Sequence, residues 1–179
     1  MNPPNQQLVG GAYALAAFTA WGVLPVYFHE MSFVPPPQML AHRFVWAMLL
    51  LAGLVTVIGG WRRIGRALRE RRTLLMLLGS TAFISANWLT FIWAVGAERV
   101  TEVSLGYYIN PLVNVLLGML VLRERLNPAQ GVAVVLAMIG VTNLAVQTAG
   151  LPWPSLAVAF SFGFYGLIRK TTALGSVDG

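Results

Sequence analysis

The chain has 179 residues, of which 57% are hydrophobic and 10% are charged, and its formal net charge is +6. Soluble domains contain about 25% charged residues, so this chain has too few charged side chains to cover a soluble globule of its size. Disorder is excluded as well, because disordered segments combine low hydrophobicity with high charge. The chain has no cysteine, which excludes a disulfide scaffold, a zinc site with cysteine ligands and a thiol nucleophile.

Six apolar runs are candidates for membrane spans. A membrane helix needs about 20 mostly apolar residues to cross about 30 Å of hydrocarbon. The runs cover residues 8–28, 37–60, 74–97, 103–122, 128–146 and, shorter than the others, 155–168. They predict an all-α, polytopic membrane protein with about six transmembrane helices. The first run does not indicate a cleaved signal peptide, because no lysine or arginine precedes it.

The basic residues lie almost entirely on one side of the predicted spans. Ten of the twelve follow the second, fourth or sixth run: Arg62, Arg63, Arg66, Arg69, Arg71, Arg72, Arg123, Arg125, Arg169 and Lys170. Because basic residues mark the cytoplasmic side, we expect a cytoplasmic N-terminus. We interpret the arginine-rich stretch as a topology signal that also touches anionic lipid. The expected partner of these charges is therefore the lipid bilayer and not nucleic acid.

Two short segments of the chain, far apart in the sequence, resemble each other. Residues 17–24 read AFTAWGVL and residues 161–168 read SFGFYGLI, so Phe18 matches Phe162 and Gly22 matches Gly166. Five predicted spans separate the starts of the two copies, and an odd number of spans inverts the second copy in the membrane. Inverted repeats are typical of secondary transporters, whose substrate site lies near the midplane between the copies.

Several segments resemble a known transporter family. They are AAFTAWGVLPVYF (16–28), HRFVW (42–46), NWLTFIWAV (87–95), EVSLGYYINPLVNVLLG (102–118), LRERL (122–126) and PSLAVAFSFGFYGLIRK (154–170). Together they resemble the RarD-type branch of the EamA family, in the drug/metabolite transporter superfamily. The resemblance implies a bacterial inner-membrane protein of ten helices in two five-helix repeats, which moves a small organic solute or drug by alternating access.

The resemblance also sets an expectation about length. Family members are longer, so we expect residues 8–146 to form the first five-helix repeat and residues 151–179 to begin a truncated second one. A fragment of this kind is expected to be inactive in transport. The competing hypothesis is a non-transporting membrane interaction or assembly protein.

Arg43 is the first candidate for solute contact, because an ionisable residue at membrane depth is a functional candidate by default. It lies six residues after Pro37, which places it about 9 Å below the membrane boundary at 1.5 Å per residue. Solute contact, snorkelling to the boundary and a structural ion pair all stay open. The possible partners for an ion pair are Glu30, Glu98 and Glu102.

The fourth run carries three further cavity candidates. Tyr107, Asn110 and Asn114 are spaced i, i+3, i+7, which places them on one helical face. Pro111 has no N–H, so the carbonyl of Tyr107 loses its usual helical partner. A kinked helix with free polar groups suits a cavity wall. The alternative is packing, because asparagine amides also bond neighbouring membrane helices.

The remaining candidates are single residues in the first three runs. Asn87 lies too deep for an interfacial residue, so it faces either protein or a cavity. Trp46 offers a stacking surface for an aromatic or cationic solute, although core packing is the more common role for such a residue. Gly22 and Pro25 predict a bend in the first span, either a gate hinge or a static kink, and Pro111 is a third gating candidate.

Enzyme motifs are missing from the sequence. There is no G-x-x-x-x-G-K-[ST] phosphate loop and no G-x-S-x-G nucleophile elbow. The two histidines have no carboxylate at helical spacing that would complete a metal site. We therefore expect neither an enzyme nor a protein with a cofactor or metal. The pattern leaves the solute, the coupling ion, the direction of transport and the oligomeric state open.

Overall fold

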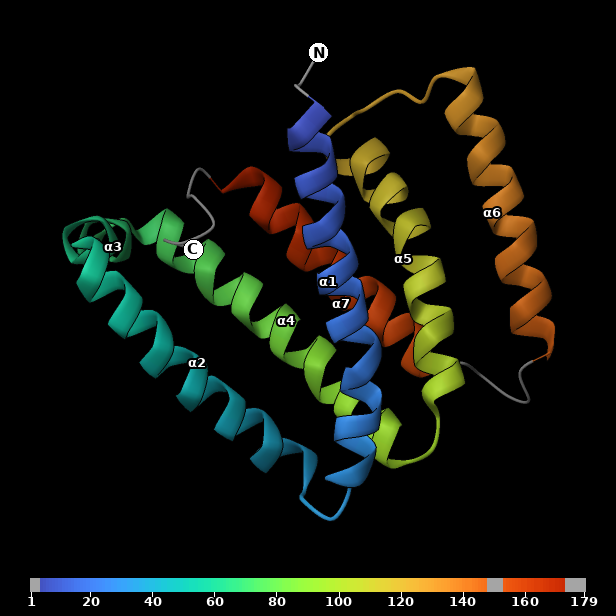
Figure 1. Cartoon of the computed structure of the whole chain (residues 1–179). Coiled ribbons are helices and arrows are strands. Elements are labelled where there is room, and N and C mark those ends of the chain that lie inside the picture. Colours follow the sequence, from blue (N-terminus) through green and yellow to red (C-terminus); the bar gives the residue numbers. More distant parts are fainter. Residues whose placement is uncertain (1–3, 148–152, 173–179) are drawn as a thin grey trace.

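The computed structural model describes residues 4–147 and 153–172, and these residues form seven α-helices without a strand (Figure 1). The helices are α1 (Pro4–Glu30), α2 (Pro36–Ile58), α3 (Trp61–Arg69), α4 (Arg71–Gly96), α5 (Val100–Val121), α6 (Pro128–Gln147) and α7 (Trp153–Thr171). Five of them (α1, α2, α4, α5 and α6) are long and apolar enough to cross a membrane. The predicted all-α, polytopic class is confirmed.

The sixth predicted span, residues 155–168, lies inside α7. This helix has 19 residues and carries Arg169 and Lys170 in its last turn, and it is not one of the five helices that qualify as spans by length and hydropathy. Of the predicted second repeat, residues 151–152 and 173–179 lie outside the described residues.

Helix α3 is the element that the sequence analysis did not predict. Gly59 ends α2 with a φ of 66°, a left-handed conformation that favours glycine. The N–H of Gly60 then donates to the carbonyl of Val55, and α3 begins at Trp61. The Trp61 indole N–H donates to the Thr56 hydroxyl over 3.1 Å. The arginine-rich connection is therefore a short helix across the end of α2, not a loop.

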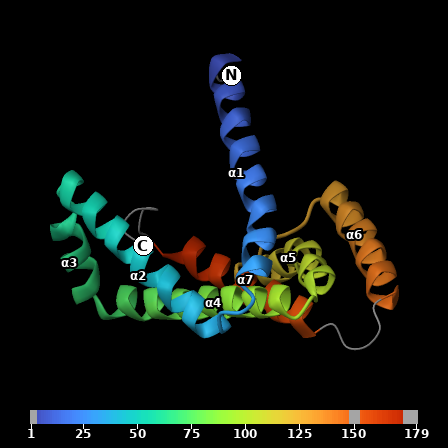
Figure 2. The same ribbon diagram turned by 60° about the horizontal axis from the view of Figure 1, so that its bottom comes forward.

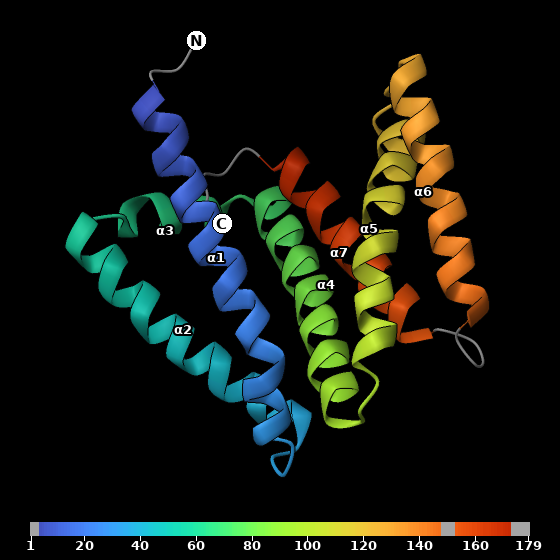
Figure 3. The same cartoon turned by 45° about the vertical axis from the view of Figure 1, so that its right-hand side comes forward.

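The tightest packing joins α7 to α4 and α5, as Figure 3 shows. A Cβ added to Gly106 of α5 would lie 2.6 Å from the carbonyl oxygen of Ser155 in α7. A Cβ on Gly163 of α7 would lie 2.7 Å from Val113 Cγ1. Small residues at such positions let membrane helices approach closely. The Ser155 hydroxyl also donates to the carbonyl of Glu102 across the same interface.

Helices α1, α2 and α6 are attached more loosely. The N-terminal half of α1 projects away from the other helices (Figure 2), and its Leu8 and Tyr13 are each 74% exposed. No described residue of α6 is buried. Apolar side chains on these helices face outward, as expected for surfaces in contact with lipid tails.

The connections α1–α2 and α4–α5 lie at the same end of the bundle (Figure 1), which we call the α1–α2 end. Helix α3 lies at the opposite end. Helices α1 and α5 continue through Pro25 and Pro111, which both lie inside the helical residues.

Candidate functional site

Aromatic rings from α1, α4 and α5 form one cluster around Trp88 of α4. The Trp88 ring centroid lies 6.3 Å from that of Trp21, 6.2 Å from Phe28 and 5.7 Å from Phe91. The Phe91 ring lies 6.3 Å from that of Tyr107 in α5. These separations fall in the range of favourable aromatic pairs. The cluster therefore joins α1 to α4 and α4 to α5.

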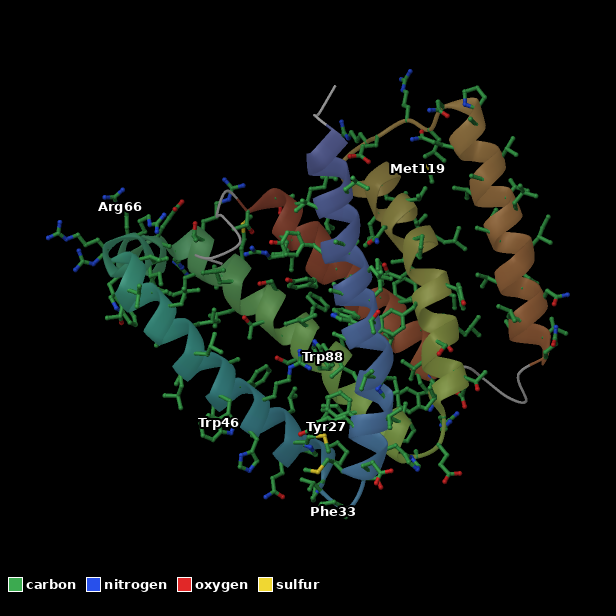
Figure 4. All side chains as sticks on the ribbon, in the orientation of Figure 1. Tyr27, Phe33, Trp46, Arg66, Trp88 and Met119 are labelled. Carbon is green, nitrogen blue, oxygen red and sulfur yellow. The ribbon has the colours of Figure 1, made fainter. Side chains whose placement is uncertain are left out.

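Arg43 of α2 lies over this cluster. Its guanidinium carbon is 3.3 Å from the ring centroid of Trp88, well inside the distance for a cation–π contact. Figure 4 shows Trp88 among α1, α2 and α4.

Residue counts to the α1–α2 end show that these residues lie at one depth in the bundle. Arg43 follows Pro36 by seven residues, Tyr107 follows Val100 by seven, and Trp88 precedes Gly96 by eight. At 1.5 Å per residue, all three lie about 10–12 Å from that end. Side chains at one depth on neighbouring helices can form one site.

The ion pair that the sequence allowed as one role for Arg43 is absent from the described part of the chain. Glu102 instead pairs with Arg99, with 2.5 Å between Glu102 Oε1 and Arg99 Nε and 2.8 Å between Oε2 and Nη2. Within residues 4–147 and 153–172, no carboxylate oxygen lies within 4.0 Å of the Arg43 guanidinium, and no hydrogen bond from it occurs. Its close partner is the face of an indole ring.

An open pocket of about 540 Å³ lies beside the aromatic cluster, a size typical of sites for small organic ligands. It lies between α1, α4 and α5, and none of its lining residues is charged. They are Phe18, Trp21, Gly22, Leu24, Trp88, Phe91, Ser104, Tyr107 and Tyr108. We call this the aromatic pocket; its polar atoms include the Ser104 and tyrosine hydroxyls and the indole N–H groups.

A second open pocket, of about 620 Å³, lies between α5 and α6. Its lining includes Pro111, Glu124 and Arg125 but no aromatic residue. Because α6 has no buried described residue, one wall of this pocket is held loosely. It offers neither stacking surfaces nor a charge at membrane depth, so the aromatic pocket is the stronger candidate.

Asn87 and Asn110 hold α7 in place. Their side chains are only 2% and 8% exposed. The amide of Asn87 donates to the Val158 carbonyl (3.0 Å) and the Ser161 hydroxyl (3.1 Å), and that of Asn110 donates to the Ala159 carbonyl (3.1 Å). The packing alternative thus describes the contacts of both residues, and a role in solute binding stays a prediction.

The third asparagine is exposed. The amide of Asn114 donates to Asn110 Oδ1 over 2.9 Å, and Asn114 lines a crevice of about 230 Å³ between α5 and α7 together with Gly163, Gly166 and Lys170. Of the three residues predicted to share a face, Tyr107 lines the aromatic pocket while Asn110 and Asn114 lie against α7. Direct solute contact of Asn114 stays a prediction.

Trp46 lies apart from the aromatic pocket. It is 68% exposed, and Figure 4 shows it on the side of α2 away from α4. Of the gating candidates, Gly22 lines the aromatic pocket and Pro111 lines the α5–α6 pocket. Pro25 is partly exposed. Gating by any of the three stays a prediction.

The comparison with known families decides the class of the protein. The sequence profile of the EamA-like transporter family matches residues 8–146, more than half of the chain. The chain belongs to this family.

Within the EamA family, this chain is similar to proteins of the RarD type. It is 42% identical to Protein RarD from Salmonella typhi over 175 residues, which cover 98% of this chain and 60% of the relative. RarD from Escherichia coli is 41% identical, with 98% and 59% covered. The Chloramphenicol-sensitive protein RarD from Pseudomonas aeruginosa is 32% identical, with 95% and 58% covered. The chain thus spans about 60% of these relatives' length. No solved structure matches it.

These matches confirm the RarD-type resemblance and a multi-pass membrane protein of a transporter family. The family is one of transporters, which agrees with the expectation that the chain is not an enzyme. The described residues contain no group of three or more histidine, aspartate or glutamate side chains able to hold a metal. The division into a first repeat over residues 8–146 and a second over 151–179 stays a prediction.

Proposed function

We propose that this EamA-family chain is part of an inner-membrane transporter that moves a small organic solute or drug by alternating access. The solute binds in the aromatic pocket. The observation that carries this proposal is the contact of Arg43 with Trp88, one of the residues that line that pocket. A charge held at membrane depth beside an apolar pocket is typical of a solute pathway.

Two parts of the bundle differ in how firmly they are held, which supports alternating access. Helices α4, α5 and α7 are joined by buried amides and by glycine contacts. Ring contacts of Trp21 and Phe28 join α1 to α4, and no side-chain hydrogen bond between these two helices occurs among the described residues. We propose that α1, with Gly22 and Pro25, moves against the α4–α5–α7 unit. Transporters alternate by such movement of one part against another.

The charge distribution supports the orientation. Six exposed arginines lie in or next to α3: Arg62, Arg63, Arg66, Arg69, Arg71 and Arg72. Because arginine is enriched on the cytoplasmic side, we propose that the α3 end faces the cytoplasm and contacts the lipid bilayer there. The N-terminus is then cytoplasmic, and the aromatic pocket lies in the outer half of the membrane.

We propose that transport needs a chain as long as the RarD relatives. The 179-residue chain by itself then binds the solute without moving it across the membrane. The runner-up function is a non-transporting membrane interaction or assembly protein. The exposed apolar faces of α1 and α6 favour it, because such faces can pack against other membrane helices.

The test fills the pocket without disturbing the fold. Gly22 lines the pocket and a Cβ added to it meets no atom within 4 Å, so we expect Gly22→Leu to put a large side chain at the pocket wall at little cost to the fold. Gly53 of α2 is equally free and does not line the pocket, so Gly53→Leu is the matched control. A thermal-shift screen of drugs and metabolites on the purified chain should find solutes that stabilise the wild type and Gly53→Leu but not Gly22→Leu.

Reconstitution tests the transport part of the proposal. The solutes found by the screen are offered to proteoliposomes that contain either this chain or RarD from Escherichia coli. We expect uptake by the longer relative alone. Solute-specific uptake by the purified 179-residue chain would overturn the proposed inactivity. Equal loss of binding in both leucine variants would place the site elsewhere.

A further inference from the structure

The hydrogen-bonding state of Arg43 bears on the chemistry of the solute. A guanidinium carries five N–H donors in a planar fork. The cation–π contact with Trp88 (3.3 Å) uses the charge but gives none of these donors an oxygen acceptor. No hydrogen bond or ion pair of Arg43 occurs within residues 4–147 and 153–172. Its donors are therefore open to an acceptor from outside that part of the chain.

The surroundings of Arg43 make an anion the favoured acceptor. The backbone of Arg43 lies about 10 Å from the α1–α2 end of its helix, a depth where charged side chains are nearly always paired. Glu102 is already bound to Arg99 by two hydrogen bonds. The residues that line the aromatic pocket include no charged side chain. A single positive charge thus contacts Trp88, one of the residues that line a neutral, ring-lined pocket.

This arrangement has two parts with different chemical requirements. The rings of Trp21, Trp88, Phe91 and Tyr107 offer faces and edges to a planar apolar body. Arg43 offers a fork whose geometry matches the two oxygens of a carboxylate. A cationic solute would be repelled by Arg43, which argues against the cationic class that stacking surfaces alone would allow.

We infer that the aromatic pocket takes an amphipathic organic monoanion, whose planar or aromatic body lies among the rings and whose carboxylate binds the Arg43 guanidinium. This inference rests on the proposed function and names the solute class of the same site. Arg43 acts as the specificity-determining residue, and the rings supply affinity that does not depend on charge.

Three indoles of nearly equal shape test the charge preference. They are indole-3-acetate, the neutral indole-3-acetamide and the cationic tryptamine. Binding to the purified chain in phosphatidylcholine nanodiscs near neutral pH is measured by calorimetry. We expect indole-3-acetate to bind about tenfold or more tightly than the amide, as charge-assisted hydrogen bonds allow, and tryptamine to bind most weakly.

Variants separate the charge from the pocket. Arg43→Gln should remove the preference for the acetate over the amide, and a circular dichroism spectrum and elution volume like those of the wild type show that the variant is folded. Arg43→Lys keeps the charge without the fork and should retain only part of the preference. Arg99→Gln is the matched control, because Arg99 is already paired with Glu102 and should not affect the preference.

Three experimental outcomes would contradict the inference, and they can be told apart. Equal binding of acetate and amide, lost in Gly22→Leu, would overturn the anion class and leave the proposed site standing. Retention of phosphatidylglycerol by the wild type but not by Arg43→Gln, with no preference among the indoles, would assign Arg43 to a lipid headgroup and overturn the inference. Indole binding that survives in Gly22→Leu would overturn both the inference and the proposed site.

Discussion

Arg43 and Trp88 lie on different helices, and the guanidinium carbon of the first is 3.3 Å from the ring centroid of the second. This contact joins α2 to α4 at the depth where α1 contributes Trp21 and α5 contributes Tyr107. Four helices thus bring side chains to one level of the bundle. The same indole ring contacts the arginine and lines the aromatic pocket, so it links packing to binding.

Replacement of Trp88 should therefore destabilise the bundle. Trp88→Ala removes the ring that Arg43, Trp21, Phe28 and Phe91 contact, and truncation of a packed tryptophan costs about 3 kcal/mol. Trp46→Ala is the matched control, because Trp46 is 68% exposed, and it should change the unfolding free energy by less than about 0.5 kcal/mol. Denaturant unfolding in mixed micelles measures both values, and equal losses would contradict the role of Trp88.

The amides that hold α7 should contribute modestly and separately. Asn87→Ala and Asn110→Ala each remove a buried hydrogen-bonding amide from the α7 interface. Interhelical hydrogen bonds in membranes contribute about 0.6 kcal/mol on average and up to about 1.7 kcal/mol. We expect each variant to lower the unfolding free energy by that amount. Asn114→Ala should cost less, because Asn114 is exposed and its amide donates to Asn110 of the same helix; a larger loss there would point to an unrecognised role.

Two glycines should tolerate no side chain, and a third should accept one. In Gly106→Ala the new Cβ would lie 2.6 Å from the backbone oxygen of Ser155, so α7 must shift, at a cost of about 1–3 kcal/mol. Gly163→Ala meets Val113 Cγ1 at 2.7 Å and should lose somewhat less, because a side chain can move more easily than backbone. Gly140→Ala meets nothing within 4 Å, and the higher helix propensity of alanine makes it neutral or slightly stabilising.

The experiment for these glycines is a comparison of unfolding free energies, combined with proteolysis of α7. A shifted α7 should be cleaved faster in Gly106→Ala than in Gly140→Ala. Wild-type stability in Gly106→Ala would contradict the close approach of α5 and α7.

Hydropathy placed the spans well, because a membrane helix is defined by its own composition. The predicted run 74–97 became α4 (Arg71–Gly96) and the run 103–122 became α5 (Val100–Val121). Helix α3 was missed because its arginines lower the hydropathy. Its signal was the i, i+3, i+7 spacing of Trp61, Ile64 and Leu68, which gives a short helix one apolar face.

The lateral arrangement of the helices was not predictable from these patterns. The spacing of Tyr107 and Asn110 gave a shared face, but which helix each residue meets depends on how α4, α5 and α7 pack. Trp21 and Trp88 lie beside the predicted candidates Gly22 and Asn87, but the sequence pattern does not single them out. Counts of residues to the helix ends would have placed Trp88 level with Arg43, although depth alone does not decide which side chains face each other.

The orientation of the bundle gives a further prediction, and the chain suits its test because it has no cysteine. Ser32, in the α1–α2 connection, and Arg66, in α3, are both exposed and lie at opposite ends. If the α3 end is cytoplasmic, a membrane-impermeant maleimide added to intact cells with a permeable outer membrane should label Ser32→Cys. It should label Arg66→Cys only after the inner membrane is opened.

The loss of one arginine in Arg66→Cys should not invert the protein, because five others remain in or next to α3 (Arg62, Arg63, Arg69, Arg71 and Arg72) and the bias of basic residues sets the orientation. Ser32→Cys carries all six and serves as the control for this point. Labelling of Arg66→Cys in intact cells, with Ser32→Cys protected, would mean that the N-terminus is external. The aromatic pocket would then lie in the cytoplasmic half of the membrane, and Arg43 would meet solute from the cell interior first.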